Sequence, residues 1–276
     1  MVPGGFVGLS GDGLDVALWF VAAGGNRLLV PPPLTQGFGV SAGGTSVVVG
    51  RADLSRAEGS TRLVMLSGTR FQRVSAETTL PNAKGTAGAV IGTDVFVQTG
   101  DGGGVGVELW HTASGSVTPL PAYTDAGPTD PSSGRVVLFQ GDGGCWAIAT
   151  WPQRTRPSDT AQCHPGLAFS PDGAMLAGIS GSVGDRRSGG RDNRVVVFDA
   201  SDTTTVFTSP TIPGAVQVAW ESASTLLVLA RERGDEAIVT RCDIDRRTCE
   251  RVWSVADSGE RYGVWLVVTP PGRYPS

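Results

Sequence analysis

LAFSPDGAMLAGI, at residues 167–179, contains two short apolar runs on either side of the turn-forming residues SPDG. Proline presets the first backbone angle of a turn, glycine tolerates a positive φ, and an aspartate carboxylate accepts hydrogen bonds from nearby backbone N–H groups. A third apolar run, VVVFD, follows at residues 195–199. The stretch therefore predicts two strands joined by a tight turn and followed by a third strand.

The same arrangement of apolar runs and Gly/Asp turns recurs along the chain. The copies start at about residues 6, 38, 87, 133, 167 and 215. A start-to-start spacing of roughly 35–50 residues is typical of repeat folds made of small β units. Such units bury both faces only by stacking on their neighbours, and closure into a ring removes exposed edges. We therefore predict an all-β fold, a β-propeller of about six four-stranded blades.

The domain organisation follows from this repeat. We expect residues 1–276 to form a single propeller domain, because one repeat pattern covers the whole chain. The last apolar run, YGVWLVVT at residues 262–269, has no partner strand in its own repeat, and we expect it to close the ring beside the N-terminal segment. The alternative is a β-sandwich or a pair of small β domains, although about twenty strands exceed what one sandwich uses.

Composition and charge exclude several classes of protein. Hydrophobic residues make up 40% of the chain and charged residues 17%, which argues against intrinsic disorder. The net charge is -4, and Lys84 is the one lysine among 22 basic residues. A nucleic-acid binder normally carries a basic face, so we expect no nucleic-acid partner.

The four cysteines form two pairs that are local in sequence. The spacing contains no C-x-x-C motif, which argues against a zinc site. We therefore expect disulfides between Cys145 and Cys163 and between Cys242 and Cys249. Disulfides persist in oxidising compartments, so this pairing places the protein outside the cytoplasm. The alternative is four reduced, buried cysteines that act as small apolar groups.

An apolar run near the N-terminus bears on membrane association. VALWFVAA, at residues 16–23, follows Asp12 and Asp15 and lacks the basic start of a signal peptide. The run is also too short to span a bilayer. We interpret it as a buried strand, and we expect no direct membrane insertion by this chain. A disulfide-bonded chain without a visible export signal would suit one domain of a larger, membrane-anchored protein.

At residues 167–179 the sequence resembles a blade of the WD-repeat and TolB-like β-propeller families. In those families an S-P-D-G turn joins the inner two strands, and a W-D dipeptide ends the third. Phe198 and Asp199 stand in the W-D place here, and Trp110 with His111 forms a second, degenerate match. The resemblance implies the propeller fold and the binding of proteins or peptides, without specifying a ligand.

The two histidines give little indication of catalysis. A catalytic triad needs a base, usually histidine, beside an activated nucleophile. His111 lies at the end of an apolar run and His164 in a Cys-His-Pro-Gly turn, and neither has a nucleophile motif nearby. Their spacing from the cysteines also fits no zinc finger. We expect both side chains to be structural or exposed.

Carboxylates in Gly-rich turns are the remaining candidates for chemistry. Asp12, Asp101, Asp142 and Asp172 all lie in such turns. We expect them to stabilise the turns. The alternative is that several converge at the mouth of the central channel and serve a lactonase-, glycosidase- or lyase-like enzyme.

One polar segment is a candidate partner-contact loop. GSVGDRRSGGRDN, at residues 181–193, is rich in glycine and arginine. It is either a solvated connection between two strands or a protruding loop that contacts an acidic partner, since arginine is favoured at interfaces. The candidate contact residues are Asp185, Arg186, Arg187, Arg191 and Asp192.

Together these patterns predict a non-enzymatic scaffold that binds a protein, a peptide or another ligand outside the cytoplasm. We expect no catalytic residue, no cofactor and no metal. We also expect a monomer with a protein or peptide partner whose identity the sequence does not specify. The propeller enzyme with carboxylates at its channel mouth remains the alternative.

Overall fold

The structure, a computed structural model, describes sixteen stretches of the chain, and they contain strands and turns but no helix. The described residues are 6–10, 17–22, 25–31, 38–40, 46–53, 60–67, 72–73, 78–81, 86–100, 105–130, 133–140, 145–151, 162–163, 167–180, 193–231 and 236–256.

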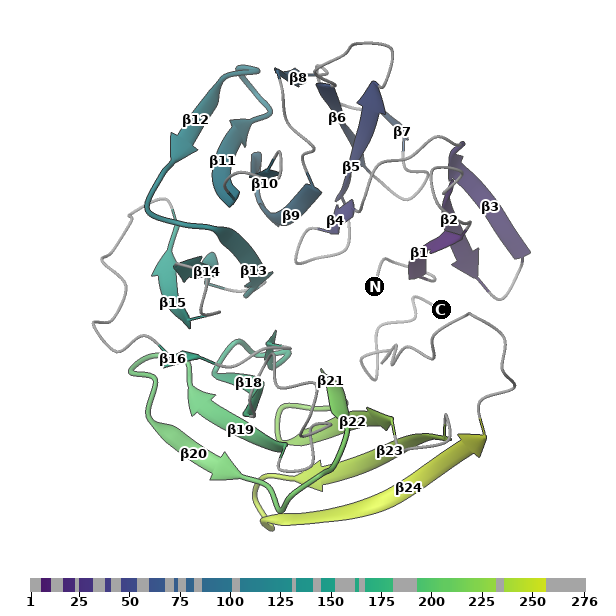
Figure 1. Cartoon of the computed structure of the whole chain (residues 1–276), viewed down its shortest axis with the longest axis vertical. Coiled ribbons are helices and arrows are strands. Elements are labelled where there is room, and N and C mark those ends of the chain that lie inside the picture. Colours follow the sequence, from purple (N-terminus) through teal and green to yellow (C-terminus); the bar gives the residue numbers. More distant parts are fainter. Residues whose placement is uncertain are drawn as a thin grey trace. The chain divides into compact units, whose positions relative to one another are not determined.

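The strands form six antiparallel sheets, and each sheet uses consecutive strands of the chain (Figure 1). In sheet two, β8 pairs with β6 beside β7, so the outer position is shared by two short strands. The first three sheets contain β1 (Phe6–Ser10), β2 (Ala17–Ala22) and β3 (Gly25–Val30); β4 (Phe38–Val40), β5 (Ser46–Asp53), β6 (Ser60–Ser67), β7 (Gln72–Arg73) and β8 (Thr78–Pro81); and β9 (Thr86–Ile91), β10 (Asp94–Gly100), β11 (Val105–His111) and β12 (Val117–Leu120).

Sheets four, five and six each have four strands in simple chain order. This is the up-and-down pattern that the repeated strand–turn–strand sequence predicts. The strands are β13 (Asp125–Thr129), β14 (Arg135–Gln140), β15 (Cys145–Thr150) and β16 (Gln162–Cys163); β17 (Ala168–Phe169), β18 (Met175–Ser180), β19 (Arg194–Asp199) and β20 (Thr205–Thr208); and β21 (Ala215–Trp220), β22 (Thr225–Arg231), β23 (Glu236–Asp243) and β24 (Thr248–Ala256).

The SPDG turn forms as the sequence predicts. It joins β17 to β18, and Gly173 has a φ of 72°, which glycine adopts without a Cβ clash. The backbone N–H of Ser170 donates to the carbonyl of Met175 at 2.8 Å, and the N–H of Gly173 donates to the carbonyl of Ser170 at 2.9 Å. These bonds close the turn and set the register of the hairpin.

The contacts within the chain divide it into two compact units, one of residues 1–142 and 149–155 and the other of residues 143–148 and 156–276. In the first unit, apolar side chains of neighbouring sheets form three buried clusters. Phe96, Leu109 and Trp110 are fully buried there. The apolar runs of the sequence thus form the packed faces of the sheets, because burying such faces drives sheet stacking.

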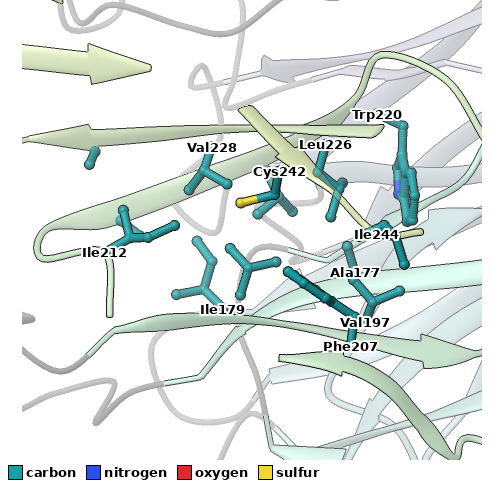
Figure 2. Packing of buried hydrophobic residues seen from close by; sticks show 14 residues of the cluster. Ala177, Ile179, Val197, Phe207, Ile212, Trp220, Leu226, Val228, Cys242 and Ile244 are labelled. Carbon is teal, nitrogen blue, oxygen red and sulfur yellow. The ribbon is translucent and has the colours of Figure 1, made fainter. Parts of the chain in front are cut away.

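In the second unit the largest buried cluster lies between sheets five and six (Figure 2). Ala177, Val197 and Phe207 come from sheet five and pack against Leu226 and Val228 of sheet six. Residues at alternate positions of each strand contribute, as expected for strands with one face in this cluster.

Glycines allow the first strands of three neighbouring sheets in the first unit to approach closely. A Cβ on Gly39 of β4 would lie 2.3 Å from the carbonyl oxygen of Gly88 on β9. A Cβ on Gly88 would in turn lie 3.0 Å from the carbonyl oxygen of Ala126 on β13. Real Cβ atoms do not approach other atoms as closely as the first distance, so this packing requires glycine at position 39.

The structure confirms the all-β class and the repeat of four-stranded sheets. It adds three short strands that the sequence pattern did not indicate, β8, β13 and β16. The predicted closing strand at residues 262–269 lies outside the described residues, so ring closure and the single domain stay predictions.

Candidate functional site

The candidate partner-contact loop lies almost wholly outside the described residues. All five of its charged candidates, Asp185, Arg186, Arg187, Arg191 and Asp192, are in this undescribed part, and Asn193 is where description resumes. His164 and the turn carboxylates Asp12, Asp101 and Asp142 also lie outside the described residues. The described candidates are His111, Asp172 and the cysteines.

Asp172 serves its own turn. Its Oδ1 accepts a hydrogen bond from the Ser170 hydroxyl at 2.6 Å and one from the backbone N–H of Ala174 at 3.1 Å. The Ser170 oxygen accepts the backbone N–H of Met175 at 2.9 Å. Ser170 is fully buried, so this small network satisfies polar groups that would otherwise be costly inside the protein.

His111 belongs to a cluster of polar side chains around Asp94. β10 and β11 place Asp94 and His111 opposite each other, and the imidazole Nδ1 lies 2.9 Å from Asp94 Oδ1. The indole N–H of Trp151, which follows β15, donates to Asp94 Oδ2 at 2.6 Å. The Trp151 ring also packs edge-on against Phe96, with ring centroids 5.0 Å apart. One carboxylate therefore holds two aromatic side chains that are far apart in the sequence.

The main role that this cluster can serve is to orient the His111 ring. A carboxylate that accepts the Nδ1 proton of a histidine fixes the tautomer and leaves Nε2 as the acceptor. The His111 side chain is 32% exposed and that of Asp94 19% exposed. Sequence analysis identified His111 but missed Asp94 and Trp151, whose partnership depends on the pairing of β10 with β11 and on a contact across 57 residues.

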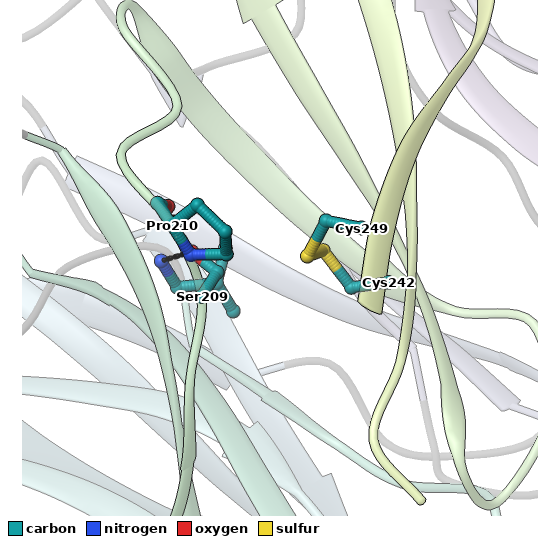
Figure 3. The surroundings of a disulfide bond; sticks show 5 residues. Ser209, Pro210, Cys242 and Cys249 are labelled. Carbon is teal, nitrogen blue, oxygen red and sulfur yellow. Dashed lines mark hydrogen bonds between the residues drawn. A yellow bond between two sulfur atoms is a disulfide. The ribbon is translucent and has the colours of Figure 1, made fainter. Parts of the chain in front are cut away.

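The disulfide of sheet six joins Cys242 on β23 to Cys249 on β24 (Figure 3). The two residues face each other in the hairpin, with Cα atoms 4.1 Å apart. In sheet four, β15 and β16 place Cys145 opposite Cys163, and Cys145 is disulfide-bonded. These placements agree with the two local pairs that the sequence predicts.

Two carboxylates in the first unit are desolvated. Burial raises the pKa of Asp125 on β13, although the backbone N–H of Ala126 donates to it at 2.7 Å and partly offsets the shift. Burial also raises the pKa of Glu108 on β11. A carboxyl group with a raised pKa is a candidate proton donor, and Asp125 is the more buried of the two.

The described residues contain neither a candidate metal centre nor a membrane-spanning helix. Across the described ranges, no three or more His, Cys, Asp or Glu side chains gather where one metal ion could hold them. Those ranges likewise contain no helix with the length and apolar character needed to cross a bilayer.

The outer part of sheet six carries an exposed aromatic side chain beside a group of charges. Trp253 on β24 is 46% exposed. Arg241 on β23 forms two 2.7 Å hydrogen bonds to the carboxylate of Glu221. The Glu221 hydrogen bond and charge raise the pKa of Arg241, and the nearby charge of Glu250 on β24 adds to this shift. Both carboxylates therefore act on the one guanidinium.

The fold is similar to several solved structures. TolB from Acinetobacter baumannii matches 86% of this chain with a TM-score of 0.54 and 11% identity, and this chain covers 59% of TolB. An uncharacterized protein from Listeria monocytogenes EGD-e matches 93% of this chain and 83% of its own length, with a TM-score of 0.62 and 7% identity. A candidate 6-phosphogluconolactonase from Bacteroides uniformis matches 91% and 82%, with a TM-score of 0.59 and 13% identity.

These similarities define the class of fold. Six successive antiparallel sheets, most of them four-stranded, together with propeller-type neighbours, make this chain a β-propeller of about six blades. No protein-family model and no curated protein sequence matches the chain. At 7–13% identity the three structures share its fold, and fold alone does not specify function.

Proposed function

We propose that this β-propeller is a non-enzymatic scaffold that binds a protein, a peptide or another ligand outside the cytoplasm. The observation that carries the proposal is that these described polar side chains form hydrogen bonds within the fold. Asp94 and His111 bond to each other, Asp172 bonds within its turn, and Glu221 pairs with Arg241. Groups that orient strands and turns in this way support a rigid framework more than a set of free reactive groups.

The location outside the cytoplasm is supported by the cysteines. Cys242 and Cys249 are joined, Cys145 is disulfide-bonded, and no described cysteine is free. Disulfides are rare in the reducing cytosol, where thiols stay reduced. The proposal includes the case in which this scaffold is one domain of a larger, membrane-anchored protein.

The proposed contact loop provides the test. The purified chain is used to capture partners from an extracytoplasmic fraction, and each captured protein is re-purified and titrated against the chain by calorimetry. Replacing Arg186, Arg187 and Arg191 with alanine should leave stability within about 0.5 kcal/mol and abolish saturable binding. A chain that binds no purified component saturably would contradict the scaffold function, and unchanged binding by the triple variant would leave the loop a connector.

The enzyme alternative has one observation in its favour, the desolvated Asp125 on the first strand of sheet four. A raised pKa is typical of general acids, and one structural neighbour is a candidate 6-phosphogluconolactonase. The chain is incubated with a panel of lactones and glycosides, beside the Asp125→Asn variant. The scaffold proposal expects no turnover above buffer from either protein. Turnover that Asp125→Asn abolishes would favour the enzyme.

A further inference from the structure

Strand β24 is the outermost described strand of sheet six. Among the described strands, β24 pairs only with β23, and its nine residues run from Thr248 to Ala256. The Cα separation of 4.1 Å between Cys242 and Cys249 is that of a non-hydrogen-bonded antiparallel pair. The backbone N–H and C=O of Cys249 therefore point away from β23, toward the outer edge. An edge of this kind is a template for an added strand.

An irregularity in the β23–β24 pairing brings two recognition groups onto one face. Val239 faces Trp253 and Arg241 faces Glu250, with a register shift between Val239 and Thr240. Val239 and Arg241 are two residues apart on β23, so they and their partners lie on the same face. Trp253 and Glu250 are therefore neighbours, although three positions separate them in the sequence.

The charges on this face favour a cationic occupant. The face beside Trp253 carries two carboxylates, those of Glu221 and Glu250, and one guanidinium, that of Arg241. A tryptophan ring attracts a cation placed over its face, and a nearby carboxylate strengthens that attraction. The net charge of -4 on the whole chain acts in the same direction.

We propose that β24 binds an extended peptide strand of a partner protein that carries arginine or lysine, with the cation held between the Trp253 ring and Glu250. Backbone hydrogen bonds to the outer edge of β24 hold the strand, and the cation selects it. This inference rests on the proposed binding function and names the chemistry of one partner. The disulfide keeps the first residues of β24 in register with β23, so the template is ordered before binding.

The test uses a fluorescein-labelled octapeptide of alternating valine and arginine, titrated with the whole chain by fluorescence anisotropy. Trp253→Ser should raise Kd about tenfold, because it removes the ring and its contact area. Glu250→Gln should raise Kd and weaken the salt dependence of binding. Leu28→Ser, which changes a 43% exposed side chain on β3, is the matched control and should leave Kd unchanged. Circular dichroism verifies that each variant is folded.

Two further peptides separate the backbone contribution from the charge contribution. The same peptide with N-methyl groups on alternate backbone amides should not bind, because it cannot pair along the edge. A peptide of alternating valine and glutamate should also not bind. Equal Kd values for the wild-type chain and Trp253→Ser would overturn the proposal, and so would equal affinity for the arginine and glutamate peptides. A doubly substituted Trp253→Ser, Glu250→Gln chain that still captures every natural partner would overturn it while leaving the scaffold function standing.

Discussion

Asp94 lies at the first position of β10 and accepts hydrogen bonds from two aromatic side chains. His111 reaches it from the neighbouring strand, and Trp151 reaches it from the residue after β15. Hydrogen bonds to an ionised carboxylate are stronger than neutral ones. Asp94 therefore connects parts of the first unit that share no strand pairing with each other.

Replacing Asp94 with asparagine should destabilise the protein by about 1–3 kcal/mol. The asparagine amide has one oxygen and one NH2 group, so either His111 or Trp151 would lose its acceptor. The midpoint of urea unfolding measures this loss. Asp245→Asn, at an exposed turn position, is the matched control and should change stability by less than about 0.5 kcal/mol. Equal midpoints for the two variants would show that the Asp94 bonds contribute little.

Asp125 gives a prediction about pH. Burial raises its pKa in the folded state, so the folded protein holds this proton more tightly than the unfolded chain. The ionised carboxylate is therefore destabilising at neutral pH, and the penalty falls as pH decreases through the folded pKa. Asp125→Asn should be more stable than the wild type at pH 7, and the difference should shrink toward pH 4. Urea unfolding at both pH values tests this, and a difference that grows on acidification would contradict it.

At the scale of elements, the sequence pattern located the strands with alternating apolar residues and missed the irregular ones. β13, with sequence DAGPT, contains Gly127 and Pro128, which both normally interrupt strands. It forms because proline is tolerated at an edge strand, here beside a register irregularity in its pairing with β14. A Cβ on Gly127 would lie 2.9 Å from the Phe139 ring. Packing therefore favours glycine here, although glycine normally interrupts a strand.

Among the described glycines, Gly39 on β4 is the one whose added Cβ would approach another atom most closely. Gly39→Ala should cost about 1–3 kcal/mol, because its Cβ would lie 2.3 Å from the Gly88 carbonyl oxygen and the two strands would have to separate. Gly106→Ala on β11 is the matched control, since its Cβ would make an ordinary 3.6 Å contact with Thr99. Alanine there should be neutral or stabilising by about 0.5–1 kcal/mol. Thermal unfolding of the two variants gives the comparison, and similar melting temperatures would rule out the close approach.

The Cys242–Cys249 disulfide belongs to the hairpin of β23 and β24. Replacing both cysteines with serine should lower stability by about 2–3 kcal/mol, since the unfolded chain gains freedom and a buried position becomes polar. Intact mass with and without reduction, followed by alkylation mapping, establishes the bond in the natively isolated protein. Four freely alkylated thiols would contradict both disulfides and the location outside the cytoplasm.

At the scale of the whole molecule, the repeat predicts a closed ring. Sheet one has three strands within the described residues, whereas sheets three to six have four. The run YGVWLVVT at residues 262–269 places Gly263 between Tyr262 and Val264, as Gly39 lies between Phe38 and Val40 in β4. The parallel favours a β-strand for this run, and we expect it to complete sheet one, which has three described strands.

Removing residues 262–276 should therefore expose strand edges and cause aggregation. Light scattering and size-exclusion chromatography of the truncated and full chains measure this. A control that removes only residues 270–276 should remain soluble and monomeric. If the longer truncation is as soluble and as stable as the full chain, the closing strand is wrong.

The sequence by itself determined the all-β class, the spacing of the sheets, the SPDG turn and the local cysteine pairs. These features depend on residues close together in the chain, where alternation of apolar side chains and turn chemistry act directly. Only the tertiary structure decided that Asp94 receives Trp151, that Gly39 must be glycine, and that Glu250 and Trp253 share a face. Each of these depends on a register shift or on a contact between distant residues, and neither leaves a periodic trace in the sequence.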